Sequence, residues 1–226
     1  MKKWDKLPEQ FQNHAVRPYY ELLSKKTFNL VLKRAFDIFT ALFILILCLP
    51  FMLIISVVIK CDSRGPVFFR QRRVTRYGRV FRIFKFRTMV TDAEKLGTQV
   101  TVNNDSRVTK AGRFLRKTRL DELPQLFNVL SGDMTFVGTR PEVERYVSRY
   151  TDEMQATLLM PAGITSLASI KFKDEEKLLS GAENADETYI NKVLPEKMKY
   201  NLEYLNKFNF FYDIKLMFMT FFAVLK

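Results

Sequence analysis

A long stretch without any charged residue constrains this chain more than any other feature. It covers residues 38–59 and reads IFTALFILILCLPFMLIISVVI. At ~1.5 Å per helical residue, these roughly 22 residues are enough to cover the ~30 Å hydrocarbon core of a bilayer. Helices of this length in soluble proteins rarely lack a polar face. The stretch therefore predicts a membrane segment, with a buried core helix as the alternative.

Basic residues flank this segment on both sides. They are Lys25, Lys26, Lys33 and Arg34 upstream, and Lys60, Arg64, Arg70, Arg72, Arg73, Arg76, Arg79 and Arg82 downstream. Since positive charge stays on the cytoplasmic side, a straight span would place one group on the wrong side. We therefore predict a re-entrant helical hairpin over residues 31–60. Its break is expected at Leu49-Pro50, because a proline lacks the backbone donor and clashes with the preceding turn. A kinked single span is the alternative.

The rest of the chain predicts a mixed α/β fold that is mostly helical. Residues 1–30 form an N-terminal arm, expected on the surface with short helices, and residues 61–207 form a cytosolic domain. Apolar residues on either side of Arg76-Tyr77-Gly78 predict a small β-hairpin. Helices are expected over residues 107–130 with a break near Pro124, and over residues 142–159 and 186–205. Residues 208–226 favour an amphipathic helix in the membrane interface, with a core-docked helix as an equal alternative.

Composition excludes several kinds of site. His14 is the only histidine, so a histidine-ligated zinc site and a Ser-His-Asp triad are not expected. Cys48 and Cys61 lack metal-ligand spacing and are interpreted as reduced. The formal net charge of +13 requires an anionic counterpart. Nucleic acid, an anionic membrane surface and a phosphorylated substrate all satisfy this requirement.

Two adjacent carboxylates, Asp121 and Glu122, are the sharpest local candidates for chemistry. Neighbours on a helix diverge by ~100°, so the two would not share one proton as a close dyad does. Both can still reach one metal ion or one phosphate, and either can act as a nucleophile. The structural alternative is an exposed acidic pair on a solvated helix face.

A set of basic residues forms the second constellation, and it consists of Lys85, Arg87, Arg107, Arg113 and Arg140. Arginine suits bidentate binding of phosphate oxygens, and phosphoryl transfer requires positioning and neutralisation of charge. The alternative is a basic surface that faces anionic lipid headgroups. There is no P-loop, no GxGxxG and no nucleic-acid-binding motif, so nucleic acid is not an expected partner.

Several long motifs in consistent order resemble the bacterial sugar transferase family, the small monotopic phosphoglycosyl transferases. They are Lys33-Arg34-Ala35-Phe36-Asp37, Gly65-Pro66-Val67-Phe68-Phe69-Arg70-Gln71-Arg72-Arg73, Lys85-Phe86-Arg87-Thr88-Met89, Leu120-Asp121-Glu122-Leu123-Pro124-Gln125-Leu126-Phe127-Asn128-Val129-Leu130, Gly132-Asp133-Met134 and Val137-Gly138-Thr139-Arg140-Pro141-Glu142. The match extends from about residue 30 to residue 226.

The resemblance implies an enzyme that transfers a sugar 1-phosphate from a UDP-sugar to undecaprenyl phosphate and releases UMP. Such an enzyme initiates bacterial glycoconjugate synthesis at the cytoplasmic face of the inner membrane. Asp121 corresponds to the nucleophile that forms a covalent phosphosugar intermediate. Glu122 corresponds to its partner at a Mg²⁺ site, so Asp121 and Glu122 are the implied metal residues.

Within the basic set described above, we assign the substrate phosphates to Lys85, Arg87, Arg113 and Arg140. Arg107, Asp186 and Tyr189 are further candidates, placed only by their order along the chain. Inner-membrane lipids are expected partners, and self-association into a homodimer is left open. The rival interpretation from a different functional class is a non-catalytic, membrane-anchored basic domain that binds anionic lipid or nucleic acid.

Five departures from the family's usual pattern concern the substrate. Thr75 stands where glycine is common, and Thr139 replaces the first proline of Gly-Pro-Arg-Pro. The stretch over residues 161–169 contains an added Ala162, with Ser166 and Ser169 at altered positions. These differences keep the identity of the sugar open.

Overall fold

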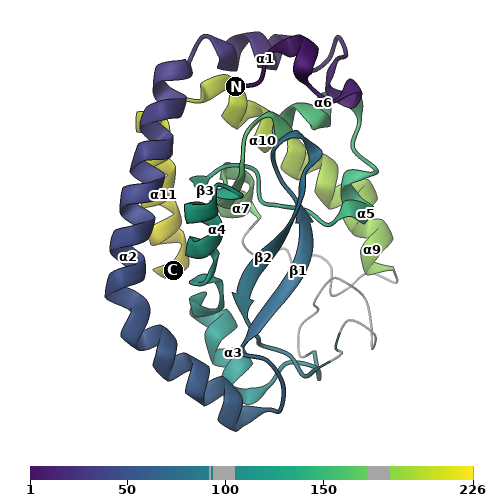
Figure 1. Cartoon of the computed structure of the whole chain (residues 1–226). Coiled ribbons are helices and arrows are strands. Elements are labelled where there is room, and N and C mark those ends of the chain that lie inside the picture. Colours follow the sequence, from purple (N-terminus) through teal and green to yellow (C-terminus); the bar gives the residue numbers. More distant parts are fainter. Residues whose placement is uncertain (92, 94–104, 173–183, 226) are drawn as a thin grey trace.

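The computed structural model describes residues 1–91, 93, 105–172 and 184–225. Within these ranges the chain is mostly helical with two small sheets, as its sequence predicts (Figure 1). The α-helices are α1 (Arg17–Ser24), α2 (Thr27–Asp62), α3 (Lys110–Lys117), α4 (Gln125–Ser131), α5 (Glu144–Val147), α6 (Asp152–Gln155), α7 (Leu167–Lys171), α9 (Ala185–Thr188), α10 (Leu194–Lys207) and α11 (Phe210–Leu225). The strands are β1 (Phe68–Val74), β2 (Val80–Phe86), β3 (Met134–Val137) and β4 (Ala162–Thr165). Short helical turns complete the fold: η1 (Trp4–Lys6), η2 (Glu9–Phe11), η3 (Arg76–Gly78), η5 (Leu120–Glu122), η6 (Ala156–Leu159) and the π-helical turn η7 (Tyr189–Val193).

Helix α2 contains the whole apolar segment. Within the described part of the chain it is the one helix long and apolar enough to cross a membrane, by length and composition alone. The predicted break at Leu49-Pro50 is not observed, because α2 continues through Pro50. A proline removes one backbone hydrogen bond, while the bonds of the flanking turns keep the helix intact. Figure 1 shows α2 along one side of the molecule, changing direction over its length without ending.

Charged side chains fasten the first third of α2 to the rest of the protein. Lys33 Nζ donates to the carbonyl of Val137 at 2.7 Å and to Asp213 Oδ2 at 2.6 Å. Asp37 Oδ2 accepts from Thr135 Oγ1 at 2.6 Å. Lys33 and Asp37 are both buried. The polar start of the predicted membrane segment therefore packs against β3 and α11 inside the protein.

The other end of α2 contacts the same body of the protein. Arg87 donates to the carbonyls of Ser63 at 2.7 Å and Arg64 at 2.9 Å. Asp62 Oδ2 accepts from the backbone N–H of Ala111 at 3.1 Å. Between its two anchored ends α2 leaves large apolar side chains exposed, and among them are Phe39, Leu42, Phe43, Ile46, Leu47, Leu49, Phe51, Leu53, Ile54, Val57 and Val58.

The predicted β-hairpin is confirmed, with β1 and β2 antiparallel around η3. Its second strand is fastened to α4, because Asn128 accepts from the N–H of Phe84 at 2.8 Å and donates to the carbonyl of Arg82 at 3.1 Å. The predicted break near Pro124 is also confirmed, since η5 ends before that residue and α4 begins after it. Gly132 ends α4 with a φ of 84°, a conformation that favours glycine.

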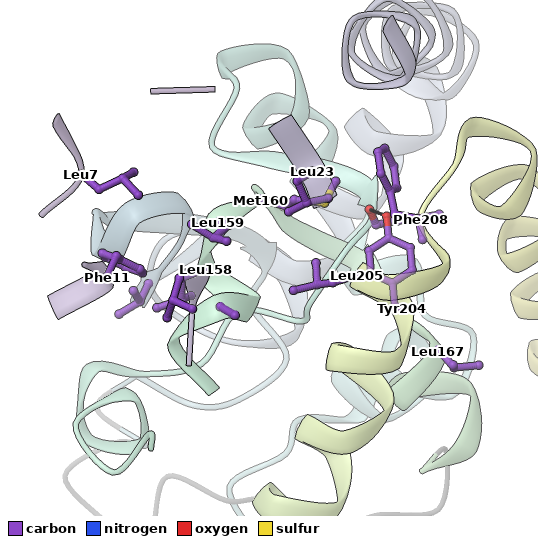
Figure 2. Packing of buried hydrophobic residues seen from close by; sticks show 14 of the residues in the cluster. Leu7, Phe11, Leu23, Leu158, Leu159, Met160, Leu167, Tyr204, Leu205 and Phe208 are labelled. Carbon is purple, nitrogen blue, oxygen red and sulfur yellow. Dashed lines mark hydrogen bonds between the residues drawn. The ribbon is translucent and has the colours of Figure 1, made fainter. Parts of the chain in front are cut away.

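The N-terminal arm is not a surface arm, and in this respect the prediction was wrong. Leu7, Phe11, Val16 and Leu23 are 0 to 4% exposed and belong to the main hydrophobic core. Figure 2 shows labelled residues of the arm in the same cluster as Leu158, Leu159, Tyr204 and Phe208. The buried residues come from different short elements, so their spacing shows no period.

The predicted helix over residues 142–159 is also wrong in detail, because three short elements replace it. These are α5, α6 and η6, and Thr151 begins α6 by accepting from the N–H of Met154 at 3.3 Å. Helix α11 docks on the core along one side, as one of the two alternatives for the C-terminal stretch predicts. It buries Asp213 and Leu216 against the core and exposes Phe211, Phe218, Phe221 and Phe222.

Candidate active site

Asp121 lies in the short turn η5. Arg119, the residue directly before this turn, has a left-handed conformation with a φ of 58°. Its side chain is buried, and Oδ1 accepts no hydrogen bond from any residue that the structure describes. Burial raises the pKa of Asp121, the positive charge of Lys85 opposes this effect, and Glu122 adds to it. An unpaired, poorly solvated carboxylate oxygen costs free energy of folding and is a strong nucleophile candidate.

Glu122, the next residue, has the opposite environment. Lys85 Nζ donates to Glu122 Oε1 at 2.9 Å, and Arg140 Nη2 donates to the same oxygen at 2.5 Å. Burial alone would raise the pKa of Glu122, but Arg140 and Lys85 together hold it well below its ordinary value. Strand β2, turn η5 and the loop after β3 thus bring Lys85, Glu122 and Arg140 together. We call these three residues and Asp121 the carboxylate cluster.

Lys85, the lysine of the cluster, is half-buried, with 21% of its side chain exposed. Burial lowers the pKa of Lys85, and Glu122 opposes this effect. Arg140 also donates to the carbonyl of Ile164 at 3.3 Å, which fixes its guanidinium from a second side. The side chain of Arg140 keeps 31% of its surface exposed, so it can still meet a ligand from solvent.

Three other predicted phosphate-binding candidates have different surroundings from Lys85 and Arg140. Arg87 is buried against the end of α2, where its guanidinium donates to backbone carbonyls. Arg107 binds Asp105 at 2.6 Å and the carbonyl of Ala93 at 3.0 Å. Arg113 is exposed on α3. The contacts of Arg87 are those of a residue that anchors a helix end.

Asp186 and Tyr189 bind different partners. Asp186 Oδ1 accepts from Tyr146 at 2.7 Å, while the Tyr189 hydroxyl donates to Glu142 Oε1 at 2.5 Å. Lys197 Nζ donates to the Tyr189 hydroxyl at 2.8 Å. Glu142 and Lys197 were missed as candidates. Glu142 ends the Val137–Glu142 motif that carries the family resemblance and could have been found, whereas Lys197 carries no local signal.

Two further buried polar groups near the cluster were also missed. Gln125 lies one turn after Asp121 and is completely buried, and neither of its amide atoms has a hydrogen-bond partner among the described residues. The hydroxyl of Thr139, next to Arg140, is buried and equally unpaired within the described part of the chain. Buried groups of this kind are usually satisfied, so their concentration along the segments of the cluster marks it as a functional region.

Four of the departures from the family pattern contact each other in pairs. Thr75 Oγ1 donates to the carbonyl of Asp133 at 2.6 Å and accepts from the N–H of Ala162 at 3.0 Å. Ser166 begins α7 by accepting from the N–H of Ser169 at 2.8 Å, and the two hydroxyls lie 2.9 Å apart. The hydroxyls of Thr75, Ser166 and Ser169 therefore all make hydrogen bonds within the fold.

The carboxylate cluster fits a divalent cation only together with a ligand. No group of three or more His, Cys, Asp and Glu side chains that could hold a metal occurs in the described ranges. The unpaired Oδ1 of Asp121 is a hard oxygen ligand of the kind that Mg²⁺ prefers. Mg²⁺ usually binds through one or two carboxylates and the phosphates of a substrate, and the donor set agrees with that pattern.

Comparison with known proteins identifies relatives of this chain. A family model described as bacterial sugar transferase matches residues 28–226. The chain is 39% identical over 199 residues to the UDP-glucose:undecaprenyl-phosphate glucose-1-phosphate transferase of Escherichia coli K12, covering 86% of this chain and 40% of that protein. It is 37% identical over 192 residues to the UDP-N-acetylgalactosamine-undecaprenyl-phosphate N-acetylgalactosaminephosphotransferase of Aeromonas hydrophila, covering 84% and 42%.

A third relative carries a different sugar in its name. The galactosyl transferase CpsE of Streptococcus agalactiae is 34% identical over 232 residues, covering 98% of this chain and 48% of that protein. The chain thus spans less than half the length of these three relatives. All three names describe a transfer reaction, and each names a different sugar.

Proposed function

This chain belongs to the bacterial sugar transferase family, and on that premise we propose that it transfers a sugar 1-phosphate from a UDP-sugar to undecaprenyl phosphate. UMP is the second product, and the lipid-linked sugar begins a bacterial glycoconjugate. One observation carries the proposal: Oδ1 of Asp121 is buried and has no hydrogen-bond partner among the residues that the structure describes. It lies next to Glu122, which Lys85 and Arg140 hold ionised. The related proteins named above support the substrate classes.

The proposed first step is attack by the Asp121 carboxylate on the sugar-bearing phosphorus of the UDP-sugar. A bond forms between Asp121 and this phosphorus, and the bond from phosphorus to the bridging oxygen breaks. UMP leaves with that oxygen and its electron pair. Lys85 and Arg140 supply positive charge beside the reacting phosphates, which is the main demand that phosphoryl transfer makes on a protein.

In the proposed second step, a phosphate oxygen of undecaprenyl phosphate attacks the same phosphorus. The bond from Asp121 to phosphorus breaks, and Asp121 is regenerated as a carboxylate. Splitting one transfer into two steps in this way is typical of nucleophilic catalysis. Asp121 and Glu122 would hold Mg²⁺, which when bound neutralises charge on the diphosphate.

The test of this function is product analysis of the purified protein with Mg²⁺ and a panel of UDP-sugars. With the correct sugar and no lipid acceptor, the protein should gain the mass of one phosphosugar at Asp121 and release UMP. Addition of undecaprenyl phosphate should remove the added mass. Salt-sensitive binding to anionic vesicles without UMP release from any UDP-sugar would instead favour the anchored, non-catalytic domain.

The acid side of the pH profile should reveal the environment of Asp121. Because burial raises its pKa, Asp121 takes up a proton at a higher pH than an ordinary aspartate, whose pKa is about 3.9. The protonated carboxyl is not a nucleophile, so adduct formation should decline as the pH falls through this raised value. The rate of UMP release in a single turnover, measured between about pH 4 and 8, follows this decline. A constant rate over this range, with an unchanged thermal midpoint, would contradict the assignment.

We further propose that α2 enters and leaves the inner membrane on its cytoplasmic face. The support is that Lys33, Asp37 and Arg87 fasten its two ends to the same protein body. Its exposed apolar side chains would then lie within the bilayer between two interfacial ends. Such a path is the re-entrant arrangement predicted from the flanking charges, with a continuous helix in place of a broken one.

Cysteine labelling in intact cells tests this path of α2. Cys61 is naturally exposed near the C-terminal end of α2, and Lys25→Cys adds a reporter before its start, with Cys48→Ser removing the third thiol. A membrane-impermeant maleimide should label neither reporter in intact cells and both after lysis. Labelling of position 25 from outside would indicate a single span instead.

A further inference from the structure

The loop that carries Arg140 is fixed on both sides. On one side, the N–H of Gly138 donates to the carbonyl of Thr165 at 2.9 Å, and the N–H of Gly163 donates to the carbonyl of Thr139 at 2.8 Å. On the other side, the N–H of Val74 donates to the carbonyl of Glu142 at 2.9 Å. Arg140 therefore lies between two points at which the loop is bound to neighbouring strands.

The side chain of Glu142 is the centre of a second buried ionic group. Its Oε1 accepts from the Tyr189 hydroxyl at 2.5 Å and lies 3.4 Å from Lys197 Nζ. Its Oε2 lies 3.8 Å from Arg73 Nη1. Burial alone would raise the pKa of Glu142, but Lys197 and Arg73 hold it below its ordinary value. Glu142 is therefore ionised at neutral pH. We call Glu142, Arg73, Tyr189 and Lys197 the Glu142 cluster.

Arg73 connects the Glu142 cluster to the site. Its Nη1 donates to the carbonyl of Pro141 at 3.1 Å, directly after Arg140. Burial lowers the pKa of Arg73, Glu142 opposes this effect, and the like charge of Arg140 adds to it. Two arginines thus lie close enough to repel each other, and each has its own carboxylate. Glu122 accepts from Arg140, and Glu142 neutralises Arg73.

Tyr189, which contacts Glu142, lies in an unusual structural element. Tyr189 begins the π-helical turn η7, between α9 and α10. Such turns are rare and often occur at functional sites. Lys197 follows on α10, where its ammonium group also lies 4.9 Å from the centre of the Tyr189 ring. Both partners of Glu142 therefore come from a segment remote in sequence from the carboxylate cluster.

We propose that Glu142 is a positioning residue for Arg140. It keeps Arg73 neutralised and the loop fixed, so that the Arg140 guanidinium stays on Glu122 in the orientation that receives the diphosphate. This inference rests on the proposed function, in which Arg140 binds substrate phosphate. Glu142 itself needs no contact with substrate.

A double-mutant cycle tests the inference through the dependence of one substitution on the other. Arg140→Lys keeps the charge and loses the planar fork, so it should slow UMP release by about tenfold or more. Glu142→Gln should slow UMP release similarly and change the same parameter, kcat or KM, that Arg140→Lys changes. In the double variant the two effects should be far less than multiplicative, because a displaced Arg140 has already lost its fork geometry.

The matched control is Glu144→Gln, two residues further along the chain. Glu144 forms an exposed ion pair with Arg72 at 2.9 Å, so its substitution should combine multiplicatively with Arg140→Lys. Where Glu142→Gln impairs folding, Tyr189→Phe replaces it, because this change removes the Tyr189 hydroxyl and keeps the ionic partners. Multiplicative effects of both variants with Arg140→Lys would overturn the proposal and leave Glu142 a role in stability only.

Thermal midpoints of the same proteins separate this inference from the proposed function. If the wild type releases UMP from no UDP-sugar, the function fails while the contact between Arg140 and Glu122 remains measurable. Non-additive shifts of the midpoint for Glu142→Gln and Arg140→Lys would then support positioning. Additive shifts would overturn it.

Discussion

Replacing Asp121 with asparagine should abolish both the phosphosugar adduct and turnover, while the protein becomes slightly more stable. The amide cannot act as the anionic nucleophile, so the rate should fall by more than about 10⁴-fold, as when other catalytic nucleophiles are removed. Mass spectrometry of the protein and measurement of UMP release check both effects. A fully active Asp121→Asn protein would refute the assignment, whatever the family relationship suggests.

The stability gain follows from the burial of Asp121. Because burial raises its pKa, the ionised form destabilises the folded state, and the neutral amide avoids this cost. We expect a gain of about 1 kcal/mol at neutral pH, or roughly 2 to 4 °C in the thermal midpoint. The gain should shrink as the pH falls through the raised pKa, and it should vanish below the ordinary aspartate value of about 3.9, where Asp121 is neutral in both the folded and the unfolded protein. Asp152→Asn, at an exposed position in α6, is the control and should change neither activity nor midpoint.

Replacing Glu122 with glutamine should have the opposite effect on stability. The substitution leaves Lys85 and Arg140 without the carboxylate that both contact. Breaking a fully buried ion pair from one side costs about 3 kcal/mol or more, but these side chains are 11 to 31% exposed. We therefore expect a cost of about 2 kcal/mol and a fall of roughly 4 to 8 °C in the thermal midpoint. UMP release should also fall by about 10²-fold, because the cations lose their positions beside the diphosphate.

A compensating variant distinguishes charge balance from a general packing defect. Because Glu122 has a pKa well below its ordinary value, its contribution to stability is present above the ordinary value and is lost as the pH falls through the lowered one. Lys85→Met in the Glu122→Gln background removes one of the two unbalanced charges and should recover part of the midpoint. It should recover no activity. A lower midpoint in the double variant than in Glu122→Gln would contradict the electrostatic explanation.

Local sequence patterns were sufficient where neighbours along the chain determine the structure. The hairpin around Arg76–Gly78, the interruption at Pro124 and the glycine end of α4 follow from turn and helix chemistry within a few residues. The apolar segment was sufficient to predict a helical membrane segment, and α2 is long and apolar enough for one. The effect of Pro50 was overestimated, because a single missing hydrogen bond bends a helix more readily than it ends one.

Patterns were insufficient where burial depends on distant partners. The N-terminal arm looks polar, yet Leu7 and Phe11 are buried, since several short elements each contribute one or two side chains to a core built by α10 and η6. Thr75 and Ala162 each look like an isolated departure from a family pattern. Only their contact at 3.0 Å relates the two.

The sequence by itself determined which residues were available for chemistry: the Asp121-Glu122 pair, the basic residues, and the absence of a second histidine. Only the tertiary structure decided their roles. It buried Asp121 and left its Oδ1 without a hydrogen-bond partner in the described part of the chain. It also paired Glu122 with Lys85 and Arg140 and placed Arg87 at the end of α2. The physical reason is that a side chain's type is local, whereas its solvation and its ionic partners depend on strands and helices that are remote along the chain and meet only in the folded protein.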